Sequence, residues 1–170
     1  FGGWLRDRIR EQAGEASGPL KIMYRVDGSS DLEEEVLEHF EGYRGSRPVR
    51  IGNGAADQLQ LDIYGEAMDS IYLADTHGLQ VGHEFWSRLA DMIDWLCENW
   101  NQSEEGIWET RGGRQDFTYG RLMSWVALDR AIRLARRRAR PADLSRWIIE
   151  RDQIYKEIME RGWNHERETF

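Results

Sequence analysis

The chain has 170 residues, 40% hydrophobic and 32% charged, and its 23 basic and 31 acidic side chains give a formal net charge of -8. Such a chain carries enough apolar surface to bury a core, which excludes wholesale disorder. It contains no apolar run near the roughly 18 residues that a membrane span needs, and its acidic balance argues against nucleic acid as the main partner.

The first third of the chain alternates short elements with loops. Residues 4–12 are predicted to form the end of a helix, and residues 22–24 a short extended segment. A short acidic helix is predicted over residues 32–40, capped by Ser30, because carboxylates are favourable at the positive N-terminal end of a helix. A loop is expected over residues 42–54.

Helical periodicity dominates the rest of the chain. Two apolar stripes over residues 55–74 predict a helix buried on two sides, and one stripe over residues 83–100 predicts an outer helix. A long polar loop over residues 101–119 separates these from predicted helices at residues 120–138 and 143–161. Without a strand pattern of useful length, the sequence predicts an all-α fold of antiparallel helical hairpins.

The loop over residues 104–113 carries the clearest chemical signal, a Trp108-Glu109 pair flanked by glycines. A carboxyl pressed against an indole loses solvation of its ionised form, so its pKa rises and it can act as a general acid. A glycosidic oxygen is one group that such an acid protonates. A capped loop with a packed tryptophan is the alternative that the residues alone leave open.

A second polar segment, residues 45–66, places amide and carboxylate side chains at the mouth of a predicted helix. Such side chains are the usual partners of sugar hydroxyls. The candidates for this role are Asn53, Asp57 and Gln58. Asp62 and Glu66 lie one helical turn apart and are expected to share a face with Gln58.

Four blocks, at residues 22–28, 45–66, 106–113 and 122–131, together resemble successive blocks of glycoside hydrolase family 15. They occur in family order and cover nearly the whole chain. The family contains glucoamylases, glucodextranases and a bacterial group of trehalases. The resemblance implies an (α/α)6 toroid, of which residues 1–170 would form about half, as a partial catalytic domain truncated at both ends.

The resemblance further implies inverting hydrolysis of an α-glucoside or oligosaccharide, with Glu109 as general acid and no cofactor. The residues that it would place around the substrate are Trp108, Arg111, Tyr24, Asn53, Asp57 and Gln58. The family's general base lies in a later block, beyond the end of this chain, so the isolated chain is expected to be inactive. A non-catalytic α/α-repeat module that binds carbohydrate or a partner is the alternative.

Half a toroid is expected to leave an uncovered apolar patch through Leu61, Tyr64 and Met68, and so to favour self-association.

The remaining polar groups are interpreted as structural. His77 and His83 fit no zinc spacing, so no metal site is expected. A basic run over residues 133–140 is expected to form a solvated face at a helix C-terminus, and Asp129 a salt bridge with an arginine. The single cysteine, Cys97, is expected in the core. With no possible internal disulfide and no visible signal peptide, we expect a cytoplasmic protein.

Overall fold

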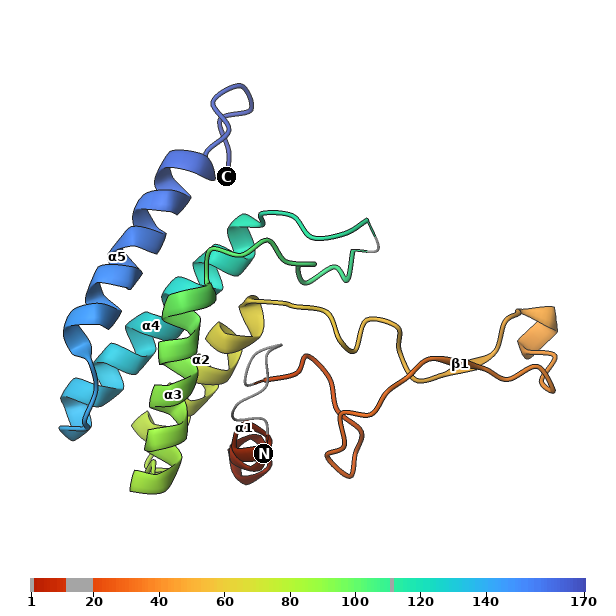
Figure 1. Ribbon diagram of the computed structural model, residues 1–170, viewed down its shortest axis with the longest axis horizontal. Coiled ribbons are helices and arrows are strands. Elements are labelled where there is room, and N and C mark those ends of the chain that lie inside the picture. The colour runs from red at the N-terminus through yellow and green to blue at the C-terminus, as the bar shows by residue number, and fades with distance from the viewer. Residues whose placement is uncertain (1, 12–19, 111) are drawn as a thin grey trace.

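The fold is described here from a computed structural model, which covers residues 2–11, 20–110 and 112–170. Within these ranges the chain is mostly helical, as predicted (Figure 1). The helices are α1 (Gly2–Glu11), α2 (Asp62–Thr76), α3 (His83–Asn99), α4 (Thr118–Arg138) and α5 (Leu144–Arg161). A 3-10 turn (Tyr43–Gly45) and two short strands, β1 (Glu35–Val36) and β2 (Arg50–Ile51), complete the elements. None of the described helices is long and apolar enough to cross a membrane.

Helix α4 is the central helix of the bundle, because it packs against α2 on one side and α5 on the other (Figure 1). Short connections at residues 77–82 and 139–143 join α2 to α3 and α4 to α5, which confirms the predicted hairpins. The core is contiguous through these helices. Its largest fully buried side chains include Trp86, Trp147, Tyr64, Met92 and Leu128.

The predicted stripe on α3 is confirmed by its burial, since Leu89, Met92 and Leu96 are all 0% exposed. Cys97 is buried, as expected. Asp129 makes the expected salt bridges, with its Oδ2 2.6 Å from Arg130 Nη1 and 2.7 Å from Arg133 Nε.

The basic run at the end of α4 is only partly the solvated face that the sequence predicted. Arg138 Nε lies 3.0 Å from Oδ1 of Asp75, a carboxylate that is 1% exposed. Arg140 donates to the carbonyl oxygen of Val81. These two arginines therefore tie the end of α4 and the residues after it to the last turn of α2 and to the α2–α3 connection.

Helices α2 and α4 approach closely at Gly65 because this position has no side chain. A Cβ at residue 65 would lie 2.4 Å from the backbone oxygen of Met123. We expect Gly65→Ala to lower the free energy of unfolding by about 1–3 kcal/mol, since the clash with backbone outweighs the gain in helix propensity. Urea unfolding measures the change. Gly3→Ala is the matched control, because a Cβ there meets nothing within 4 Å, and an equal loss in both variants would contradict the clash.

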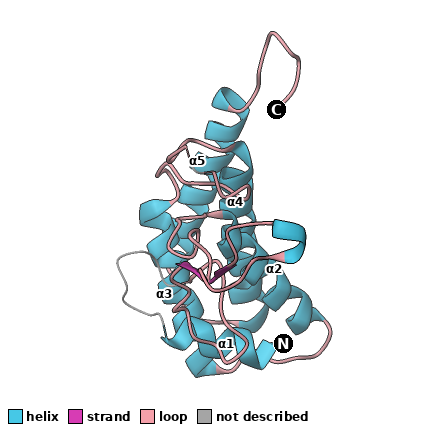
Figure 2. Cartoon of the chain, turned by 90° about the vertical axis from the view of Figure 1, so that its right-hand side faces the viewer, coloured by secondary structure: helices cyan, strands magenta, loops and turns pink. Residues whose placement is uncertain are grey.

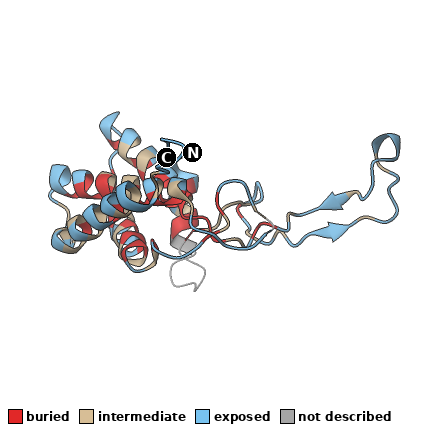
Figure 3. Ribbon diagram, turned by 90° about the horizontal axis from the view of Figure 1, so that it is seen from above, coloured by how far each residue is buried: buried red, intermediate tan, exposed pale blue. Residues whose placement is uncertain are grey.

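The segment that contains β1 and β2 forms an extended arm, which projects from the helical body (Figures 1 and 3). Its strands pair antiparallel, with Glu35 opposite Ile51 and Val36 opposite Arg50. The helix predicted over residues 32–40 is therefore wrong. The segment lies on the arm, away from the helix core, so its apolar side chains have no surface against which a helix could pack. Backbone pairing with residues 49–53 stabilises it instead.

The helix predicted from residue 55 begins only at Asp62, so Gln58 does not share a helical face with Asp62 and Glu66. The apolar residues Leu59 and Leu61 are buried in a non-helical stretch instead.

The uncovered patch expected through Leu61, Tyr64 and Met68 is also wrong, since all three residues are 0% exposed. The ring of Tyr64 lies 5.1 Å from that of Trp95, centroid to centroid. Helix α3 therefore contributes to covering this face of α2.

Candidate functional site

The candidate site lies at the end of the bundle where α2 and α4 begin. Two chain segments approach this end, the stretch that leads into α2 and the connection between α3 and α4 (Figures 1 and 2). The second is the predicted long loop, and it carries Trp108 and Glu109.

The base of this loop is closed by a backbone bridge. The N–H of Glu104 donates to the oxygen of Gln115 at 2.8 Å, and the N–H of Gln115 donates back at 2.7 Å. Within the loop, the N–H of Glu109 donates to the oxygen of Gly106 at 3.1 Å. Glu109 has φ of 51°, a left-handed conformation that is uncommon outside glycine and is often found at functional sites. The loop thus presents Glu109 on a tight turn.

The side chains of Trp108 and Glu109 both face solvent. Trp108 is 82% exposed, and Glu109 is exposed as well. The sequence predicted a carboxyl desolvated by packing against the indole, and that prediction is wrong for this structure. An exposed indole beside an exposed carboxylate is instead open to a ligand, because a tryptophan face can stack on a flat apolar surface.

Gln58 is the predicted binding residue that the structure brings to this loop. Its Nε2 donates to the carbonyl oxygen of Thr110 at 3.5 Å, and its Oε1 accepts from Gln60 Nε2 at 3.3 Å. Thr110 in turn donates from Oγ1 to the oxygen of Glu105 at 2.7 Å. Gln58 therefore contacts the loop that carries Trp108 and Glu109.

The other predicted residues of the described chain precede α2, and Tyr24 among them packs against the helical body, with its ring centroid 5.4 Å from that of Trp4 on α1. Asn53 Oδ1 accepts from the N–H of Ala55 at 2.9 Å, so the asparagine stabilises a turn. Asp57 Oδ1 lies 3.2 Å from Lys21 Nζ, and the N–H of Lys21 donates to the hydroxyl of Tyr24 at 2.9 Å. Lys21 thus links Asp57 to Tyr24. Arg111 lies outside the described residues.

Acidic residues missed as site candidates surround the base of the loop. Burial raises the pKa of Asp62, at the start of α2. Burial also raises the pKa of Glu104 to about 7. Glu66 Oε1 accepts from the Tyr119 hydroxyl at 3.0 Å, and this hydrogen bond raises the pKa of Tyr119. The i, i+4 spacing of Asp62 and Glu66 was a signal in the sequence, but nothing local pointed to Tyr119.

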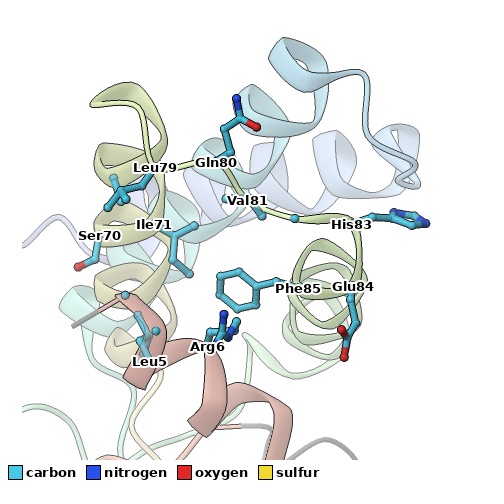
Figure 4. A pocket seen from close by; sticks show the side chains of 14 residues that line it. Leu5, Arg6, Ser70, Ile71, Leu79, Gln80, Val81, His83, Glu84 and Phe85 are labelled. Carbon is cyan, nitrogen blue, oxygen red and sulfur yellow. The ribbon is translucent and has the colours of Figure 1, made fainter.

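A separate hollow of about 770 Å³ lies between α1, the end of α2 and the start of α3 (Figure 4). Side chains that line it include Leu5, Ile71, Val81 and Phe85, and none of the predicted site residues that the structure describes is among them. It is therefore not the candidate site. Among the described residues, no group of His, Cys, Asp and Glu side chains could hold a metal ion, and His77 and His83 are exposed.

The structure thus defines an all-α domain of helical hairpins that presents a carboxylate and an indole on an exposed loop. The model of Glycosyl hydrolases family 15 matches residues 4–170. The chain therefore belongs to this family.

Curated relatives agree with the family. Trehalase from Mycobacterium tuberculosis is 42% identical over 144 residues, which cover 85% of this chain and 21% of the relative. Trehalase from Mycolicibacterium smegmatis is 40% identical over 144 residues, covering 85% of this chain and 22% of the relative. Trehalase from Thermoplasma volcanium is 36% identical over 151 residues, which cover 89% of this chain and 24% of the relative. The chain thus spans about a fifth to a quarter of these relatives. No solved structure matches it.

Proposed function

We propose that this chain is the part of an inverting α-glucoside hydrolase that carries the general acid, and that Glu109 is that acid. The observation that carries the proposal is the exposed Trp108-Glu109 turn, held on a loop with a bridged base beside Gln58. In the whole protein, the described helices would form about half of an (α/α)6 toroid. This loop would then lie at the mouth of its funnel.

In the proposed reaction, Glu109 donates its proton to the glycosidic oxygen as the bond to the anomeric carbon breaks. Trp108 packs against the apolar face of the sugar ring, and Gln58 donates to or accepts from a hydroxyl. A second carboxylate, from a part of the protein beyond this chain, activates water on the opposite face of the ring. Inverting enzymes separate the two carboxyl groups by roughly 6.5–9.5 Å.

We further propose trehalose as the substrate, because the relatives described above are named trehalases. In α,α-trehalose the reacting anomeric carbon is attacked, and the other glucose leaves with its configuration unchanged. Inversion therefore yields one β-glucose and one α-glucose from each molecule.

Proton NMR of the anomeric region tests the proposal in the protein encoded by the full open reading frame. With trehalose as substrate, we expect β- and α-glucose signals to grow at equal initial rates, ahead of mutarotation. Production of α-glucose alone would contradict inversion. A higher kcat/KM for maltose or maltotriose than for trehalose would contradict the assignment of trehalose. Sugar binding without hydrolysis would favour a non-catalytic module.

The isolated 170-residue chain is expected to hydrolyse trehalose at least about 100-fold more slowly than the full-length protein, because general acid and general base each contribute roughly 10² to 10⁴. Glucose release by a coupled assay at equal molar concentrations measures the ratio. Comparable rates would show that both carboxylates lie within the 170 residues.

A further inference from the structure

The residues at the base of the loop, Glu104 and Glu105, tie the loop to the segment that leads into α2. The N–H of Glu105 donates to the oxygen of Leu59 at 3.0 Å, and the N–H of Leu59 donates to Glu105 Oε2 at 2.8 Å. Two residues further on, the N–H of Leu61 donates to Glu104 Oε2. The two segments are 43 to 46 residues apart in sequence, so these side chains make a tertiary clamp.

The two carboxyl groups of the clamp differ in their surroundings. Glu105 Oε1 lies 3.1 Å from Nε of Arg114, which is half exposed, so this carboxylate has a cationic partner. Glu104 is 0% exposed, and among the described residues its Oε1 has no hydrogen-bond partner. A Cβ on residue 120 would lie 1.5 Å from that oxygen, so Gly120 is what admits the carboxyl against α4.

The charges that face Glu104 are Asp62 from α2, Arg121 from α4 and Glu105 from its own segment. Burial is the main cause that raises the pKa of Glu104, and Asp62 raises it further. The hydrogen bond from the N–H of Leu61 lowers the pKa of Glu104, and so does Arg121, but these effects are smaller than that of burial. Arg121 is also shared, since its Nη2 lies 3.2 Å from Asp116 and its Nη1 donates to the carbonyl oxygens of residues 100 and 102. The site therefore favours a neutral carboxyl over a second buried negative charge beside Asp62.

We propose that Glu104 is the positioning residue of the Glu109 loop: its buried carboxyl holds the base of the loop against the start of α2, and so fixes where Glu109 meets the substrate. This inference rests on the proposed role of Glu109. Glu104 touches no substrate itself. Ionisation strengthens the hydrogen bond from Leu61 but leaves an unhydrated charge on Oε1 against Gly120. Hydrating that oxygen separates the base of the loop from α4, and Glu109 leaves its working position.

The test compares Glu104→Gln and Glu104→Ala in the protein encoded by the full open reading frame, with Glu160→Gln, an exposed site on α5, as the matched control. Gln is neutral at every pH and can still accept from Leu61. We expect Glu104→Gln to keep kcat on trehalose within about threefold of the wild type at pH 6. Glu104→Ala should lower kcat at least tenfold while KM changes less than threefold.

A second readout needs no activity. The pKa of Glu104 is about 7 in the fold and near the ordinary glutamate value of 4.5 in the unfolded chain. Because the pKa is raised in the fold, the neutral carboxyl contributes its full stabilisation at pH values below the unfolded pKa of 4.5. This contribution is lost as pH rises through the folded pKa of about 7. In urea unfolding of the 170-residue chain, the equilibrium constant of unfolding for the wild type should therefore rise between pH 5 and pH 8 by about 10- to 100-fold more than for Glu104→Gln.

Two results overturn the inference: a Glu104→Gln protein that loses as much kcat as Glu104→Ala, or equal pH dependence of unfolding in the wild type and Glu104→Gln. Failure of the proposed function gives a different result. A Glu109→Gln protein that keeps most of its activity removes the general acid from this loop, while the clamp and the pH dependence of unfolding would still be measurable.

Discussion

Glu109→Gln in the full-length protein is expected to lower kcat on trehalose by about 10² to 10⁴, with little change in KM. The physical reason is that the amide cannot give a proton to the departing glycosidic oxygen, and general acid catalysis contributes about this factor. Binding is largely kept, because Trp108 and Gln58 are unchanged and the substituted side chain is isosteric. Initial rates of glucose release measure the loss.

A substrate whose leaving group needs no proton separates the acid role from a structural one. With α-glucosyl fluoride, Glu109→Gln should keep activity within about tenfold of the wild type, because fluoride departs without protonation and only the base step is required. Glu84→Gln is the matched control, since it makes the same change on the exposed first turn of α3, at the opposite end of the bundle. Equal losses on both substrates would falsify the assignment of Glu109 as the acid.

The sequence predicted the elements whose stabilising contacts follow a local repeat. The stripe that contains Leu89 and Leu96 lies along one side of α3, so its period alone locates the helix. The same logic failed at residues 55–61, because Leu59 and Leu61 are buried by distant partners rather than by a helical face. Their N–H groups donate to Glu105 and Glu104, which a local pattern has no means of showing.

For the candidate site too, local features could be predicted from the sequence and those that depend on tertiary contacts could not. The Trp108-Glu109 pair stands out because glycines and an indole beside a carboxylate are local features, and the family resemblance gave them a role. The raised pKa of Glu104 was not predictable, since it arises from burial against Gly120 of α4 and proximity to Asp62 of α2. Three segments must come together before that carboxyl differs from its neighbour Glu105.

The second large effect is expected at Trp147, which holds α5 on the bundle. The side chain is 0% exposed, and its ring centroid lies 6.2 Å from that of Trp86 on α3. Its Nε1 donates to Asp94 Oδ1 at 2.7 Å. Trp147→Ala should lower the free energy of unfolding of the 170-residue chain by about 3–5 kcal/mol, because a large cavity opens in the core. Loss of the partner of Asp94 adds to this cost.

Urea unfolding followed by far-UV circular dichroism measures the change in the 170-residue chain. Tyr155→Ala is the control on the same helix, since Tyr155 is 55% exposed and its truncation should cost less than about 1 kcal/mol. Trp147→Phe should lie between the two, because the ring contact with Trp86 is largely kept while the donor to Asp94 is lost. If Trp147→Ala and Tyr155→Ala unfold at the same urea concentration, α5 does not depend on this tryptophan for its place against α3 and α4.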